Sequence, residues 1–339
     1  MIKVISKETA IEAFNHLEDI ALGSYGRHYI FRGVKDAVKH KLSTSWERDR
    51  WEDFNNGNVE NLRNEILKYG SSLVRHSLET FDEKNLLEGL EIARHHGLPT
   101  PCIDFSYSPY IAAFFAFDGL KKEDIEKEEN RNNCSAIYAI NITSLMFVLM
   151  YKDQGWSQSL PQNLSEENII DFFRSWASTN FLMRNGLDNK YPNDNIFFVP
   201  TPGKKNWRMQ RQQGCFLYST LRYHHASNGG FEDFDSYLSH CFSNTEVSFP
   251  NFNPIEKVLI PHREAKEVFK RLELMNINAG MLLGDADSVV NDLNNQQLYR
   301  SRVAALREFN IKTLWDEIFD EQKERILKGR EAFNDEENY

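Results

Sequence analysis

The sequence predicts an α+β fold, in which a small mixed sheet is decorated by helices within a single domain. Segments typical of strands alternate irregularly with segments of helical periodicity. No Pro/Gly/Ser-rich linker, low-complexity stretch or internal repeat divides the 339 residues. The strand-like segments, in chain order, are HYIFRGV, SAIYAINI, QQGCFLYST and KVLIP.

The first elements expected are a helix and a strand. Apolar residues recur at helical spacing between Ile11 and Ile20, and Gly23 and Gly26 are expected to end this helix. HYIFRGV follows as a short strand. Residues 46–93 are polar with helical periodicity, which predicts two or more further helices.

Residues 95–117, HHGLPTPCIDFSYSPYIAAFFAF, form the most informative block. The backbone is expected to turn where its two histidines meet a glycine and a proline. Pro109 suits the first turn of a helix, and Ser106 or Ser108 can cap it. A helix N-terminus gathers unpaired N–H donors and is a natural seat for phosphate. The alternative is a capped core helix in which Asp104 is a satisfied structural aspartate.

The remaining elements follow in order. KKEDIEKEENRNN predicts a solvated helix end and loop, and SAIYAINI a strand. Residues 141–200 predict a mostly helical excursion that ends in the loop VPTPGKKN. After the strands QQGCFLYST and KVLIP, residues 264–274 predict a helix that ends near Asn276. Residues 311–339 predict an amphipathic helix and an acidic tail.

Composition and charge narrow the function classes. Apolar residues make up 41% of the chain, which is enough to build a core. The net charge of −10 argues against a general nucleic-acid-coating surface, although a local basic groove stays open. The four cysteines lack CxxC spacing, so no metal site and no disulfide framework is expected. The N-terminus is unlike a signal peptide and the apolar runs are too short to span a bilayer, so we expect a cytoplasmic protein without membrane contact.

Arg32 is the first candidate site residue. Strand alternation puts Phe31 and Gly33 on one face and Arg32 on the other. The planar guanidinium matches phosphate or carboxylate, and Gly33 permits a ligand close to the backbone. The alternative is a structural ion pair, for which Asp104 is the candidate partner.

The segment RMQRQQGCF, residues 208–216, is another candidate. Arg208, Arg211 and three glutamines offer many donors just before a strand, and Gly214 lets the backbone be approached. The alternative is a polar strand end without function.

Taken together, these segments resemble the FRG domain family, named for the tripeptide found here at residues 31–33. The family's second motif resembles QHYGLPTRLLDWTxSPxxALYFA, which ARHHGLPTPCIDFSYSPYIAAFFAF matches, and its third is close to RxxxQQGxF. LMNINAGMLLGDADSVVNDL is similar to the family's closing segment, so the resemblance spans about residues 20–310. Two positions depart from the pattern: Pro101 replaces an arginine, which weakens any anion contact made there, and Phe105 replaces a tryptophan.

The resemblance implies a domain plan and a fold. Residues 1–310 would be an FRG-type domain with a helical insertion at about 141–200, followed by the C-terminal helix and tail. FRG domains are distantly similar to the ADP-ribosyltransferase fold, in which an Arg or His followed by Gly on the first strand contacts NAD. On this analogy Arg32 holds the ribose or phosphate of NAD. Ser106 and Ser108 belong to the strand-to-helix segment, and Gln213 or a nearby carboxylate lies on the third strand.

Cleavage of the nicotinamide–ribose bond passes through an oxocarbenium-like state that needs a placed anion. Gln213 can orient a hydroxyl group but cannot neutralise a cation. Asp104, or Glu246 in SNTEVSF, is a candidate for the missing carboxylate, and we favour Asp104 because it lies within a motif. His95 is a base, a donor to phosphate, or a satisfied turn histidine.

The predicted catalytic residues are therefore Arg32, Asp104 and Gln213, with NAD as substrate. The predicted binding residues are Gly33, His95, Gly97, Thr100, Ser106, Ser108, Arg208 and Arg211. The expected function is an NAD-dependent ADP-ribosyltransferase or NAD-cleaving enzyme, a toxin or effector in bacterial phage defence. Its acceptor would be a protein or a nucleic acid, and a neutralising antitoxin is a further candidate partner. The alternative is a non-catalytic module that binds a nucleotide or a phage component, which the lack of a clear third-strand glutamate favours.

Overall fold

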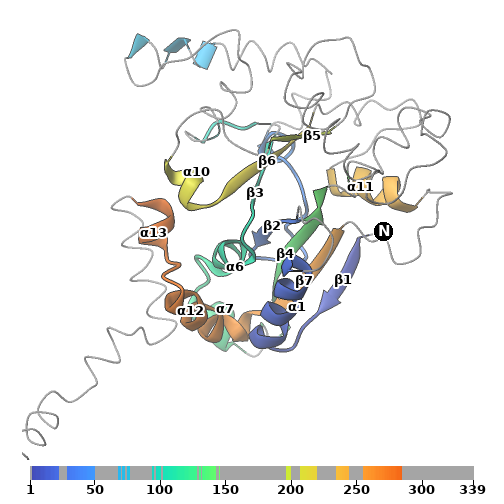
Figure 1. Cartoon of the computed structure of the whole chain (residues 1–339), viewed down its shortest axis with the longest axis vertical. Helices are drawn as coiled ribbons and strands as arrows, with labels where there is room; N and C mark the ends of the chain where they lie inside the picture. The colour runs from blue at the N-terminus through green and yellow to red at the C-terminus, as the bar shows by residue number, and fades with distance from the viewer. Residues whose placement is uncertain are drawn as a thin grey trace, which may run out of the picture.

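A mixed sheet of seven strands, in the order β1-β7-β4-β2-β3-β6-β5, organises the protein in the computed structural model (Figure 1). The structure describes residues 2–22, 29–49, 68–69, 71–72, 75–76, 94, 97–100, 102–127, 130, 132–142, 145, 196–199, 207–219, 234–243 and 255–284. β1 and β7 pair in parallel, and every other neighbouring pair in this sheet is antiparallel. The predicted α+β class is confirmed.

The strands are β1 (Lys3–Ser6), β2 (Tyr29–Val34), β3 (Cys102–Ser106), β4 (Cys134–Asn141), β5 (Ile196–Val199), β6 (Gly214–Ser219) and β7 (Ile255–Pro261). The helices are α1 (Ala10–Leu22), α2 (Ser45–Asp49), α6 (Pro109–Phe117), α7 (Lys122–Glu126), α10 (Trp207–Arg211), α11 (Phe234–Ser243), α12 (Ala265–Leu274) and α13 (Ala279–Leu283), with a 3-10 turn at His262–Glu264.

The predicted helices at residues 11–20 and 264–274 are confirmed, as are the strands HYIFRGV, SAIYAINI, QQGCFLYST and KVLIP. Residues 196–199, at the end of the predicted mostly helical excursion, form strand β5. Their sequence, IFFV, is rich in strand formers and pairs with β6. Gly23, Gly26, residues 311–339 and most of 46–93 and 141–200 lie outside the described residues.

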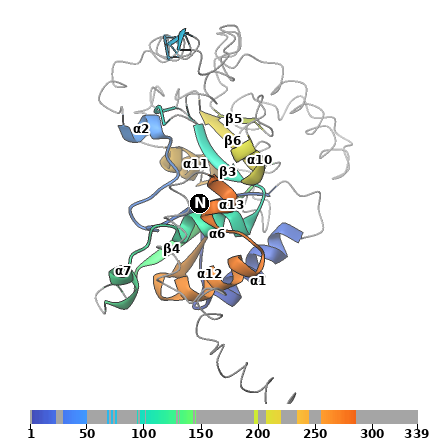
Figure 2. The same cartoon turned by 90° about the vertical axis from the view of Figure 1, so that its left-hand side faces the viewer.

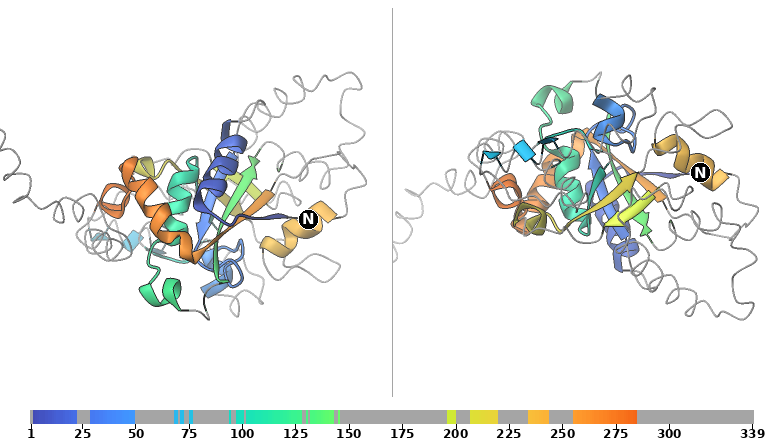
Figure 3. Two further views of the ribbon diagram at one scale, coloured as in Figure 1. Left: turned by 90° about the horizontal axis from the view of Figure 1, so that it is seen from below. Right: turned by 90° about the horizontal axis from the view of Figure 1, so that it is seen from above.

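Hydrophobic residues pack on both faces of the sheet. On one face α1, α6 and α12 bury Phe31, Ile137 and Val258 of the strands. On the other face Ile30 and Tyr138 pack against residues of α11 and of the segment that contains α2. Figure 3 shows the three helices on one side of the sheet and α11 on the other. This alternation along β2 sends Arg32 to the face opposite Phe31, as predicted.

Helix α6 is apolar around its whole circumference because it is buried in the centre of the helical layer. Pro109 begins it, and Ser108 is its N-cap, with Oγ accepting from the N–H of Ile111 at 3.4 Å. The capping prediction therefore holds for Ser108. Ser106 ends β3 and has a different role, described below.

Ser108→Ala is expected to lower the free energy of unfolding by about 1 kcal/mol, because the first turn of α6 loses its side-chain acceptor. Urea unfolding followed by circular dichroism measures the change. Ser72→Ala, at an exposed position, is the matched control and is expected to stay within about 0.5 kcal/mol of wild type. An equal loss in both variants would contradict the capping role.

Gly33 is required where α6 crosses β2. A Cβ at this position would lie 1.8 Å from the carbonyl oxygen of Ala112 and 2.6 Å from the nitrogen of Ala116. The sequence predicts that Gly33 lets a ligand approach the backbone. On the side where a Cβ would stand, the backbone of α6 occupies that space instead.

Within the described part of the chain, no helix is long and apolar enough to cross a membrane.

Candidate functional site

A cavity of about 340 Å³ lies between β2, β3, α6 and α10. It is lined by Phe31, Arg32, Gly33, Asp104, Phe105, Ser106, Ala112, Phe115, Arg208, Met209 and Gln212. Its volume is at the lower end of the roughly 300–1,000 Å³ typical of small-molecule sites. Residues from three separate sequence motifs thus meet at one place.

The sheet opens at this point. β2 pairs with β4 from Tyr29 to Val34, but Phe31 and Ser106 form the one register pair between β2 and β3 in the described strands. Next to this pair, the side chain of Arg32, and not the backbone of β2, donates to the main-chain oxygen of Asp104, and both residues line the cavity.

Arg32 is a largely buried cation at the cavity wall, with 18% of its side chain exposed. Its Nη1 donates to the main-chain oxygen of Asp104 at 2.8 Å and lies 4.0 Å from Oδ2 of the same residue. Its buried Nε has no hydrogen-bond partner among the residues described. Burial lowers the pKa of Arg32 to about 10, against the attraction of Asp104, so the guanidinium remains charged at neutral pH. It can therefore accept an anionic ligand.

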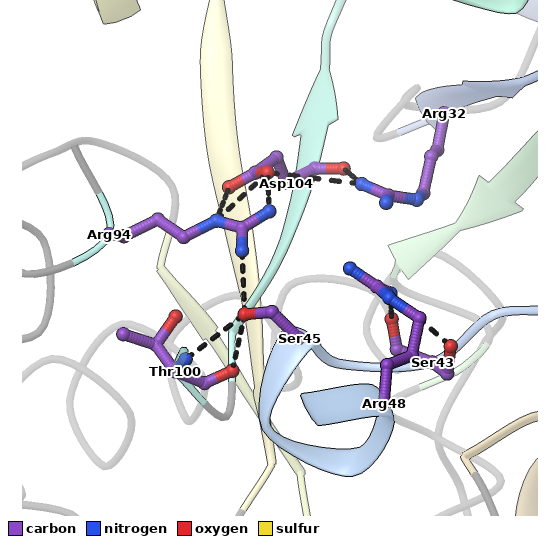
Figure 4. A network of polar contacts seen from close by, with 7 residues as sticks. All are labelled: Arg32, Ser43, Ser45, Arg48, Arg94, Thr100 and Asp104. Atoms are coloured by element: carbon purple, nitrogen blue, oxygen red, sulfur yellow. Dashed lines mark hydrogen bonds and ion pairs between the residues drawn. The ribbon is translucent and has the colours of Figure 1, made fainter. Parts of the chain in front are cut away.

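Asp104 is held chiefly by Arg94, a residue that sequence reasoning did not select (Figure 4). Nε of Arg94 donates to both carboxylate oxygens at 3.1 Å, and its Nη2 donates to Oδ2. Burial favours the neutral acid, but Arg94 and then Arg32 outweigh it and hold the pKa of Asp104 below its ordinary value. With 39% of its side chain exposed, Asp104 is an ionised carboxylate open to the cavity.

Hydrogen bonds join the second and third motifs. Oγ of Ser106 donates to the main-chain oxygen of Gln212 at 2.7 Å and accepts from the N–H of Ser108 at 3.0 Å. The side chain of Gln212 donates to the carbonyl of Leu282 at 3.3 Å, at the end of α13. Figures 1 and 2 both place α13 between α10 and α12. The turn that carries Gln212 is therefore fixed from two sides.

The structure does not bring Gln213 to the cavity. Gln213 has a left-handed φ of 47°, is exposed, and lies in the turn before β6 rather than on the strand. Gln212 lines the cavity instead. Arg211 is likewise exposed and donates to the carbonyl of Met281 at 3.3 Å, whereas Arg208 lines the cavity as predicted.

Three other predicted residues support the framework and do not line the cavity. Gly97 takes a φ of 81° in a turn and donates its N–H to the carbonyl of Arg94. Thr100 is buried, and its N–H donates to Oγ of Ser45 at 3.0 Å. Ser108 caps α6. His95, Pro101 and Glu246 lie outside the described residues.

Arg94, Met209 and Gln212 are the site residues that sequence reasoning missed. For Arg94, the available signal was its positive charge directly before the two histidines of the second motif. On β6, which pairs with β3, burial and then the charge of Asp104 raise the pKa of the Cys215 thiol far above its ordinary value, so this thiol is not a nucleophile at neutral pH. In the described ranges, no group of three His, Cys, Asp or Glu side chains is placed to hold a metal ion.

Comparison with protein families matches the FRG domain to residues 27–125. This range contains Arg32 and Asp104 but ends before the Arg208 motif, and it is narrower than the 20–310 span expected from the motifs. No curated protein and no solved structure shows significant similarity to the chain. The contribution of α10 to the cavity therefore rests on the structure alone.

Proposed function

The chain contains an FRG domain, and from that premise we propose that it is an ADP-ribosyltransferase-like enzyme with NAD as its substrate. The observation that carries the proposal is the pairing, at one cavity wall, of a buried cation with an unused donor and an ionised carboxylate. Arg32 would bind the anionic part of NAD, and Asp104 would face the positive charge that develops on the ribose.

The diphosphate of NAD suits the two arginines that line the cavity. Nε of Arg32 is buried without a hydrogen-bond partner among the described residues, so a phosphate oxygen would satisfy it. Arg208 reaches the same cavity from α10 and adds a second guanidinium. A dinucleotide could thus be anchored from both sides, from β2 and from α10.

The reaction breaks the bond between nicotinamide and ribose, and nicotinamide leaves with the bonding electrons. An oxygen or nitrogen of the acceptor, or of water, then bonds to the ribose carbon and loses its proton. Asp104 stabilises the oxocarbenium-like state between these events by its negative charge.

The protein would act as a toxin or effector in phage defence. Expression of the wild-type gene is therefore expected to slow the growth of the host more than expression of the Arg32→Ala gene.

A second candidate is a module that binds a nucleotide or a phage component without turnover. Arg94 contacts both oxygens of Asp104, and Asp104 is the one carboxylate among the described lining residues. An anion neutralised in this way stabilises a transition-state cation less than a free one does. This feature favours recognition over chemistry.

Asp104→Asn is expected to reduce nicotinamide release by roughly 100-fold while NAD binding changes little, because the transition state loses its anion. Chromatography of labelled NAD measures release and transfer to cell-extract macromolecules, and thermal-shift assays measure binding. Asp19→Asn, on an exposed part of α1, is the control and should behave as wild type. A wild-type protein that NAD stabilises but that releases no nicotinamide would reject the enzyme and support the binding module.

A further inference from the structure

Arg94 connects Asp104 to a second part of the molecule. While Nε and Nη2 contact the carboxylate, Nη1 of Arg94 donates to Oγ of Ser45 at 2.6 Å (Figure 4). Ser45 Oγ in turn donates to the main-chain oxygen of Thr100 at 3.2 Å and accepts the N–H of Thr100. The start of α2 therefore fixes the guanidinium that faces Asp104.

The titratable side chains around Asp104 differ in whether they donate hydrogen bonds to its carboxylate. Arg32, from β2, donates to the main-chain oxygen and stays 4.0 Å from the carboxylate. Arg48, from α2, donates to Ser43 and contributes only a longer-range attraction. Cys215, on β6, is a neutral thiol because burial raises its pKa. Among these neighbours, Arg94 alone donates hydrogen bonds to the carboxylate oxygens in the described structure.

We propose that Arg94 is a positioning residue, which fixes the Asp104 carboxylate at the cavity wall through hydrogen bonds to both of its oxygens. The role of Asp104 in catalysis rests on the proposed function, but its control by Arg94 does not. Two nitrogens of the Arg94 guanidinium hold the carboxylate, which restricts both its position and its rotation. The guanidinium of Arg94 donates to Asp104 and Ser45. Arg32 keeps a donor, Nε, without a partner in the described structure, and Arg32 is therefore the residue expected to bind the ligand.

The test is a titration of Asp104 in the full chain without NAD. Isotope-labelled aspartate carboxyl groups are followed by NMR, and the Asp104 signal is identified by its absence in Asp104→Asn. Arg94→Gln, which removes the charge, is expected to raise the pKa of Asp104 by at least about one pH unit. Arg94→Lys keeps the charge but loses the paired geometry, and Ser45→Ala frees the guanidinium, so each should give a smaller rise.

Arg48→Gln is the matched control, since it removes a nearby guanidinium that does not touch the carboxylate. An unchanged pKa in Arg94→Gln, or an equal rise in Arg48→Gln, would overturn the proposal. If Arg94→Gln does not fold, the pKa in Arg94→Lys decides, and a wild-type value there overturns it. In a parallel measurement, the acid limb of nicotinamide release should move upward with the pKa. Absence of release in wild type would reject the proposed function while the titration still tests Arg94.

Discussion

Replacing Arg32 with alanine is expected to weaken NAD and ADP-ribose binding by roughly 100-fold or more, the largest loss expected of any cavity residue. The buried Nε has no hydrogen-bond partner in the described structure, and in the proposed complex a phosphate oxygen of the nucleotide would supply one. Loss of the residue removes both the charge and the donor from a largely buried position. Isothermal titration calorimetry with each nucleotide measures the change directly.

The same substitution is expected to leave the fold intact. Burial already disfavours the charged form of Arg32, and Asp104 keeps its closer partner, Arg94. The melting temperature of Arg32→Ala should therefore stay within a few degrees of wild type. Arg32→Lys should restore only part of the affinity, because an ammonium group cannot reproduce the planar fork. Wild-type affinity in folded Arg32→Ala would place the ligand elsewhere.

Gly33→Ala is expected to cause the largest loss of stability, about 3 kcal/mol or more. The added methyl group would overlap the backbone of α6, 1.8 Å from the carbonyl oxygen of Ala112, and a backbone cannot turn aside as a flexible side chain can. Residues of α6 and β2 pack in the same hydrophobic core. In the variant, α6 should therefore move away from β2, or the protein should fail to accumulate in the folded state. Chemical denaturation of soluble protein measures the effect.

Gly97→Ala is the matched control for this prediction. Among the described residues, no atom lies within 4 Å of a Cβ at Gly97, but its φ of 81° disfavours any side chain. The control should therefore lose about 1 kcal/mol through backbone strain alone. If Gly33→Ala lost no more than Gly97→Ala, the close packing of α6 on β2 would be contradicted.

Periodicity predicted the elements that are long or patterned. Alternation in HYIFRGV and SAIYAINI identified β2 and β4, and it gave Arg32 its correct face. The edge strands β1 and β5 have four residues each and carry too little pattern to be distinguished from loops. β3 was not recognised as a strand because Asp104 and Ser106 interrupt its apolar residues, yet pairing with β6 along Cys102–Ser106 stabilises it.

The site was predictable to the level of motifs but not of individual contacts. Arg32, Asp104, Ser106 and Arg208 were selected from the sequence and all line the cavity. Gln213 was predicted at the site, but Gln212 lines the cavity. The left-handed backbone of Gln213 decides which glutamine faces inward, and the local sequence pattern does not show this turn. No spacing rule connects a carboxylate on β3 with an arginine ten residues earlier.

The central claim is that the cavity between β2, β3 and α10 binds NAD through Arg32. A crystal structure with NAD or ADP-ribose at saturating concentration tests it most directly. The account predicts a phosphate oxygen within about 3.2 Å of Nε of Arg32, and the ribose bonded to nicotinamide beside Asp104. A nucleotide bound elsewhere on the protein, or an empty cavity at saturation, would contradict it.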